Sequence, residues 1–168
     1  MSVDAKTIPD RIEKTIVLKA PIERVWRAIS DSAEFGRWFG VRFPEPFAAG
    51  KTVRGVITPT EVDPDVAKMQ EPWAGIAFDF AIERIEPMRR FSYRWHPGGD
   101  PHADYSKEPT TLVVFELEEV PGGTRLTITE SGFDRIPLER RAEAFSGNEA
   151  GWEHQTRLVA KYVEREGR

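Results

Sequence analysis

Two glutamates interrupt apolar patterns in the second half of the chain, and they are the first candidates for chemistry. Glu130 continues the inward-facing positions of an alternating segment, and Glu149 stands three residues before Trp152 in a segment of helical spacing. A buried carboxylate is costly unless it is paired or protonated, so its presence in an apolar register indicates a function. If both point inward, they can orient a polar ligand or serve as acid and base. The alternative is that each reaches solvent or meets an arginine such as Arg94.

The remaining titratable clusters do not match known metal or cofactor sites. Two histidines and two aspartates fall within residues 96–104, but proline and glycine make this a loop without regular spacing. The acidic residues of 61–65 begin like a calcium loop, yet a valine takes the glycine position and Pro72 the place of the bidentate glutamate. The chain contains no cysteine, no Walker or dinucleotide glycine pattern and no G-x-S-x-G elbow. We therefore expect no metal and no cofactor.

Composition excludes several classes of protein. The 168 residues include 24 basic and 28 acidic side chains, well interspersed, with a net charge of −4. The absence of a basic stripe argues against nucleic-acid binding. The first ten residues contain no apolar run of the kind found in a leader, and no window approaches the ~20 apolar residues of a membrane span. We predict a cytoplasmic protein without a membrane span.

Aromatic side chains are abundant, with five Trp and ten Phe. Large rings either pack against one another as core or line pockets and interfaces, and both interpretations stay open for this set. The polar atoms of Tyr93 and Trp95 need partners if these residues are buried. The residues predicted to line a ligand cavity are Trp38, Phe39, Phe78, Phe80, Tyr93, Trp95, Phe115, Glu130, Glu149, Trp152, Thr156 and Val159.

The spacing of apolar residues predicts the elements that would position these side chains. Residues 12–19 are expected to form a strand, and residues 21–39 carry apolar side chains at three- and four-residue steps that predict two short helices. Residues 41–58 are expected to contain two strands, followed by an acidic, proline-bearing loop over 60–72. In residues 74–133, four alternating segments are joined by short connections, which makes them antiparallel.

A long helix is predicted at the C-terminal end. Its apolar stripe, with steps of three and four, consists of Leu138, Ala142, Phe145, Glu149, Trp152, Thr156, Val159 and Val163. Gly147 and Gly151 weaken this helix by up to ~1 kcal/mol each, so it is one helix or two nearly collinear pieces. The predicted fold is α+β, a helix-grip fold in which a curved antiparallel sheet of about six to seven strands wraps around this helix. We expect one domain over residues 12–166, preceded by a flexible segment, residues 1–11.

Several local motifs, in this order, resemble a known family. They are KTIVLKAPIERVWRAISDSAEFGRWF over residues 14–39, TITESGF over residues 127–133, and Gly151-Trp152 in a helix that ends near Tyr162-Val163. The chain resembles the START and birch-pollen-allergen superfamily, also called SRPBCC. Within it, the chain is most similar to the bacterial homologues of the activator of heat-shock protein 90 ATPase. The resemblance covers residues 12–164.

The resemblance implies a helix-grip fold but does not by itself specify a function, because members of the superfamily bind lipids, hormones or polyketide-like aromatics and some are enzymes. Our leading hypothesis is a protein that holds a small apolar or aromatic ligand between the sheet and the C-terminal helix. The alternatives are a co-chaperone-like module that modulates heat-shock protein 90 ATPase, and a hydrolase- or cyclase-type enzyme. The interpretation favours binding over catalysis, and the sequence is compatible with a homodimer.

Overall fold

The computed structural model describes residues 10–97, 104 and 106–166. Its main layer is one seven-stranded antiparallel sheet with the strand order β1-β7-β6-β5-β4-β3-β2. The strands are β1 (Arg11–Leu18), β2 (Val41–Arg42), β3 (Thr52–Ile57), β4 (Ala77–Glu86), β5 (Arg90–Trp95), β6 (Thr111–Val120) and β7 (Gly123–Ser131). The helices are α1 (Ile22–Ser30), α2 (Ser32–Phe39), α3 (Pro64–Gln70) and α4 (Leu138–Glu166), with short 3-10 turns η2 (Glu71–Trp73) and η3 (Phe133–Arg135).

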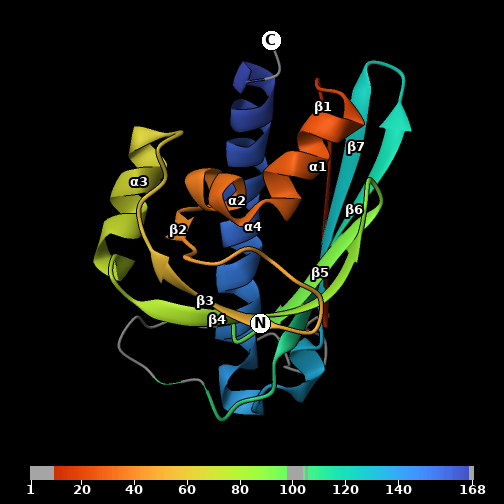
Figure 1. The fold of residues 1–168 in the computed structure, drawn as a ribbon. Coiled ribbons are helices and arrows are strands. Elements are labelled where there is room, and N and C mark those ends of the chain that lie inside the picture. Colours follow the sequence, from red (N-terminus) through yellow and green to blue (C-terminus); the bar gives the residue numbers. More distant parts are fainter. Residues whose placement is uncertain (1–9, 98–103, 105, 167–168) are drawn as a thin grey trace, which may run out of the picture.

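The predicted helix-grip architecture is confirmed. Helix α4 is a single helix of 29 residues that continues through both of its glycines. The sheet curves around it, with β1 and β7 on one side and β3 and β4 on the other, while α1 and α2 cover the helix near its C-terminal half (Figure 1). Among the described residues, no helix combines the length and apolarity that crossing a membrane requires. Of the segment predicted to be flexible, residues 1–9 lie outside the described residues, and Arg11 already belongs to β1.

The strand register aligns one row of inward-facing residues across the sheet. Ile82 lies opposite Tyr93, Tyr93 opposite Val113, Val113 opposite Glu130, and Glu130 opposite Ile12. Because side chains alternate between the two faces of a sheet, all five point to the same side. Each is buried beneath the helices. Glu130 is therefore the polar member of an otherwise largely apolar core row.

The centre of the core is filled by aromatic rings. Phe80 stacks on Tyr93 with ring centroids 3.9 Å apart and planes 7° from parallel. Phe35 of α2 meets Phe80 edge-on at 5.8 Å, and it also contacts Phe115 at 5.9 Å. The edge-on arrangement of Phe35 and Phe80 is one of the favoured geometries of buried rings. The middle of the sheet is consequently packed and contains no room for a ligand between these rings.

The segment predicted as a loop over residues 60–72 is partly helical, which corrects the prediction. The Asp63 side chain accepts hydrogen bonds from the backbone N–H groups of Asp65 and Val66 at 2.9 and 3.2 Å, and Pro64 occupies the first helical position. An aspartate N-cap followed by proline is a strong helix start. None of the residues of α3 is buried. A helix that buries no face needs no apolar periodicity, and the sequence of this segment shows none. Helix α3 and η2 together form one wall of the pocket described next.

Candidate functional site

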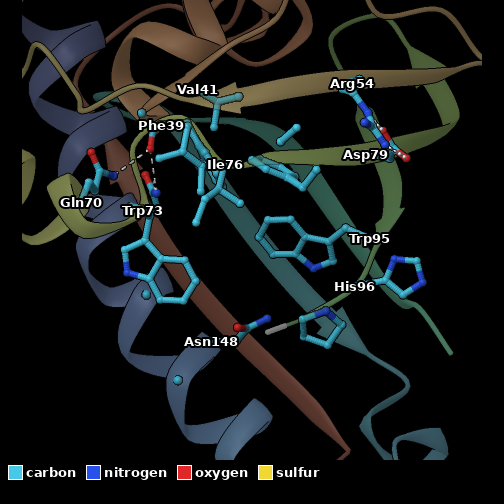
Figure 2. A pocket seen from close by; sticks show the side chains of 18 of the residues that line it. Phe39, Val41, Arg54, Gln70, Trp73, Ile76, Asp79, Trp95, His96 and Asn148 are labelled. Atoms are coloured by element: carbon cyan, nitrogen blue, oxygen red, sulfur yellow. Dashed lines mark hydrogen bonds and ion pairs between the residues drawn. The ribbon is translucent and has the colours of Figure 1, made fainter. Parts of the chain in front are cut away.

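A pocket of about 500 Å³ lies beside the packed core, between the sheet and helix α4 (Figure 2). Its walls come from the end of α2, strands β3 and β4, the α3–η2 segment, the end of β5 and the middle of α4. The aromatic side chains that line it are Phe39, Trp73, Phe78, Trp95 and Trp152. Its polar lining includes Arg54, Gln70, Asp79, His96, Asn148 and Gln155. A mostly apolar concavity with a few polar groups is the usual form of a small-molecule site.

Behind two of the tryptophans lies the carboxylate of Glu130, which is fully buried. Its Oε1 accepts a hydrogen bond from Trp152 Nε1 at 2.8 Å, and its Oε2 accepts from Trp95 Nε1 at 2.8 Å and from Thr111 Oγ1 at 2.5 Å. Asn148 Nδ2 donates to both oxygens, at 2.9 and 2.8 Å. The indole and amide groups can only donate from these nitrogens, which suits an ionised carboxylate that only accepts. The cluster fixes the orientation of both indoles and of Asn148.

The register of the sheet and the pitch of the helix bring these groups together. Trp95 and Thr111 lie directly opposite each other on β5 and β6, just beyond the row that contains Glu130. Asn148 and Trp152 are four residues apart on α4, so they share one helix face. Arg94, which was a predicted alternative partner for Glu130, instead pairs with Glu83 at 3.4 Å. The inward orientation of Glu130 is thus stabilised by neutral donors, and no cation of the described residues pairs with it.

Glu149 does not share this environment. Its side chain is exposed and is absent from the pocket wall, whereas the preceding residue, Asn148, faces Glu130. In the N-terminal half of α4, the predicted stripe is therefore wrong at Leu138, Ala142 and Glu149, which are exposed. Phe145 packs against the core as predicted, and Ala144 and Asn148 also face inward. Steps of three and of four from Trp152 are both compatible with a helix, and only packing against the sheet selects between them.

The structure divides the other predicted residues into two groups. Four line the pocket: Phe39, Phe78, Trp95 and Trp152. Six are buried in the core and do not line it: Trp38, Phe80, Tyr93, Phe115, Thr156 and Val159. Trp38 uses its indole N–H to bind the carbonyl of Ala28 at 2.9 Å, which fixes α1 against α2. The residues predicted to line a cavity therefore include both residues of the pocket wall and residues of the core that supports it.

Several pocket residues were missed by sequence reasoning. Trp73 stands on η2, in a segment without periodicity, and its aromatic character was the only available signal. Asn148 and Gln155 lie four residues before and three after Trp152, so helical spacing could have identified them. His96 lines the pocket, but the second histidine and the first aspartate of the 96–104 cluster lie outside the described residues. Among the described residues, no three His, Cys, Asp or Glu side chains form a metal-binding group.

The carbonyl of Phe39 is held from two sides at the pocket wall (Figure 2). It accepts a hydrogen bond from Gln70 Nε2 and another from Gln155 Nε2, each at 3.0 Å. Gln70 Oε1 in turn accepts the backbone N–H of Thr60 at 2.8 Å. The next residue, Gly40, has φ +98°, and a Cβ there would lie 2.6 Å from the Gln70 amide. Only glycine permits this turn and this close approach.

Two electrostatic features accompany the pocket. Arg54 and Asp79, which face each other on β3 and β4, form a two-point ion pair with nitrogen-to-oxygen distances of 3.0 and 3.4 Å. Beneath the pocket, burial raises the pKa of the Tyr93 phenol well above its ordinary value, and the charge of Glu130 raises it further. The Tyr93 hydroxyl is buried without a hydrogen-bond partner among the described residues. Tyr93 therefore stays neutral in the folded protein.

The family assignment follows from a match along most of the chain. The profile of the family described as "Activator of Hsp90 ATPase homolog 1-like protein" matches residues 19–164. The chain belongs to this family. The AHSA1-like family is part of the SRPBCC superfamily, so the resemblance inferred from the sequence motifs is confirmed. No match is found among curated proteins.

Solved structures similar to this AHSA1-like domain share its architecture. Protein MLL2253 from Mesorhizobium loti superposes with a TM-score of 0.67 at 24% identity, covering 92% of this chain and 97% of that chain. A protein from Arthrobacter aurescens gives 0.70 at 17% identity, with coverages of 98% and 90%. DynU16, a protein of the dynemicin biosynthetic locus, gives 0.66 at 24% identity, with coverages of 95% and 49%. At these identities the likeness establishes the fold alone.

Proposed function

We propose that this AHSA1-like protein binds a small apolar or aromatic molecule in the pocket between its sheet and helix α4. The observation that carries the proposal is a pair of glycines inside that helix. Gly147 and Gly151 both line the pocket, and outside the helix's own backbone no described heavy atom lies within 4 Å of a Cβ placed at either position. No steric contact among the described residues explains why these positions lack side chains.

The energetic cost of these glycines supports a functional reason. A glycine in a helix interior is about 1 kcal/mol less favourable than alanine, so the pair weakens α4 by about 2 kcal/mol. Proteins keep such local losses mainly where function needs them. Because both residues line the pocket, side chains at these positions would take up space that a ligand could occupy. The proposal explains the glycines as the means by which the helix leaves room for that ligand.

The pocket wall also has the composition expected of a ligand site. Trp73, Trp95 and Trp152 come from three separate elements and are joined there by Phe39 and Phe78. Glu130 orients two of the three indoles from behind through direct hydrogen bonds. Aromatic surfaces whose rotamers are fixed in advance lose little entropy on binding, which favours affinity.

The two alternative functions have less support. An enzyme using the predicted carboxylates would need them beside the ligand, but Glu130 is fully buried behind the wall and Glu149 is exposed away from it. A co-chaperone-like module would need a contiguous exposed apolar patch. The large exposed apolar side chains of the described residues are Val17, Met69 and Leu138, which stand on β1, α3 and α4.

A pocket-filling variant tests the proposal. Nile red, an uncharged aromatic dye whose emission reports apolar surroundings, is titrated into the wild-type protein, Gly151→Leu and Ala150→Leu. Ala150 is the exposed neighbour outside the pocket wall and serves as the matched control for added bulk. We expect one dye per wild-type chain, a loss of at least tenfold in affinity for Gly151→Leu, and no loss for Ala150→Leu. Thermal melts should show Gly151→Leu to be as stable as wild type or more so, because leucine is the better helix former.

Equal dye affinity in both variants would show that this pocket is not the binding site. The proposal would also be overturned if the wild-type protein bound neither Nile red nor trans-stilbene nor any of its 4-hydroxy, 4-methoxy and 4-carboxylate derivatives.

A further inference from the structure

The side chains of α4 that line the pocket present hydrogen-bond acceptors to it, and this restricts the class of ligand. We propose that the ligand is an uncharged aromatic molecule carrying a hydroxyl or N–H group that donates a hydrogen bond to Asn148 Oδ1. This inference rests on the proposed function of the pocket.

The orientation of the Asn148 amide is set by Glu130. The Asn148 Nδ2 donates to both carboxylate oxygens at 2.9 and 2.8 Å, and the opposite orientation would place an amide oxygen against a carboxylate. The amide group is planar, so its Oδ1 must face away from Glu130. No described residue donates a hydrogen bond to Oδ1, and Asn148 lines the pocket at half-burial. Figure 2 shows Asn148 on the helix side of the pocket, below the indoles of Trp73 and Trp95. Oδ1 is thus an acceptor available to a ligand.

Gln155 repeats this arrangement two turns further along the helix. Its Nε2 donates to the carbonyl of Phe39 at 3.0 Å, and its Oε1 is buried without a partner among the described residues. The indole N–H of Trp152, between them, is directed to Glu130. Each side-chain nitrogen that α4 contributes to the wall therefore donates to a protein acceptor. The side-chain polar atoms that remain on this wall are the two amide oxygens, which only accept.

Charge selects against an anionic ligand at the same position. Arg54, the arginine of the described wall, is already paired with Asp79 at 3.0 and 3.4 Å. The carboxylate of Glu130 lies one amide group behind Asn148 Oδ1. An anion placed against Asn148 Oδ1 would face an acceptor in place of a donor and would be repelled by Glu130 across a poorly screened interior. A hydroxyl or N–H group on a neutral aromatic frame satisfies Oδ1 without either cost.

A matched ligand series tests the inference in the wild-type protein. The probes are trans-stilbene, 4-hydroxystilbene, 4-methoxystilbene and stilbene-4-carboxylate, with dissociation constants measured by tryptophan fluorescence and confirmed by calorimetry at pH 7. We expect 4-hydroxystilbene to bind roughly tenfold more tightly than the parent and the methoxy compound, because it alone donates a hydrogen bond while remaining neutral. The carboxylate should bind most weakly.

Two variants test whether Asn148 causes the preference for the hydroxy compound. Asn148→Leu should bring the affinity for 4-hydroxystilbene to that for the methoxy compound. Met69→Leu changes an apolar, exposed residue of the same pocket and should leave the ranking intact. Equal binding of the hydroxy and methoxy compounds by wild type, tightest binding of the carboxylate, or an unchanged preference in Asn148→Leu would each overturn the inference while leaving the proposed function standing. Absence of binding by all four probes and by Nile red would overturn the proposed function itself.

Discussion

The role of Glu130 as the buried acceptor of the site leads to a sharp prediction for Glu130→Gln. Glutamine keeps the volume but replaces one carboxylate oxygen by an NH2 group. Oε1 accepts from Trp152, whereas Oε2 accepts from Trp95 and Thr111. Whichever oxygen is replaced, one indole N–H loses its acceptor. An indole nitrogen can only donate, so this N–H is then buried without an acceptor.

The expected cost follows from that indole N–H. A buried donor left unsatisfied costs about 1–3 kcal/mol, so the free energy of unfolding should fall by about 1–3 kcal/mol. For a domain of this size each kcal/mol corresponds to roughly 2–4 °C, which predicts a melting temperature lower by roughly 2–12 °C. The indoles of Trp95 and Trp152 should lose their fixed orientation, and the near-ultraviolet circular dichroism of tryptophan should weaken.

Urea unfolding at pH 7 measures this effect, with Glu149→Gln as the control. The control makes the same chemical change nineteen residues further along the chain on an exposed helix surface, where substitutions usually change stability by less than ~0.5 kcal/mol. If the two variants lost equal stability, or if Glu130→Gln lost less than ~1 kcal/mol with an unchanged tryptophan spectrum, the carboxylate would not be the acceptor that organises the indoles.

Three further predictions concern the core and the pocket wall. Tyr93→Phe should leave stability at pH 7 unchanged or raise it by up to ~1 kcal/mol, because the lost hydroxyl has no hydrogen-bond partner in the described part of the chain. Burial raises the pKa of Tyr93, so this residue stays protonated in the folded state and ionises near pH 10 only on unfolding. The stability of the wild-type protein should therefore fall as pH rises above about 10, and the stability of Tyr93→Phe should fall less. Urea unfolding at pH 7 and at about pH 10.5 measures this difference. Gly40→Ala should cost more than ~1 kcal/mol, since φ is +98° and the new Cβ would meet the Gln70 amide; an unchanged melting temperature would contradict this. Trp73→Ala should weaken Nile red binding roughly tenfold and lower the free energy of unfolding by less than ~1 kcal/mol, because Trp73 is only half-buried. Phe80→Ala should lower the free energy of unfolding by about 3–5 kcal/mol, because Phe80 is fully buried. Equal losses of stability in the two variants would refute the division into pocket wall and core.

Much of the fold could be predicted from local patterns. The alternation around Phe80 and around Phe115 has the period of a strand with one buried face, and both segments lie in β4 and β6 as expected. The short connections between neighbouring strands required antiparallel pairing, and this holds throughout the sheet. Helix α3 was missed because it buries no residue, so its start depends on the Asp63 cap and not on an apolar stripe.

The candidate site could be predicted only in part. Trp152 and Trp95 were recognisable as large rings on inward positions, and both line the pocket. Phe80 and Tyr93 satisfied the same criterion, yet they stack on each other and fill the core. A sequence pattern specifies which face a ring occupies, but it does not specify how far the helix stands from the sheet at that point. That separation depends on the curvature of the whole sheet.

The two glutamates show which side-chain orientations a sequence pattern can specify and which it cannot. By itself, the sequence determined that Glu130 belongs to the inward face of its strand, because a strand has only two faces and its neighbours define them. On a helix, steps of three and of four are both permitted, so the pattern could not choose between Asn148 and Glu149. Packing of α4 against β1 and the buried carboxylate decided for Asn148, whose amide can donate to Glu130 where a second carboxylate could not. Only the tertiary structure could make that choice, because it depends on contacts between residues far apart in the chain.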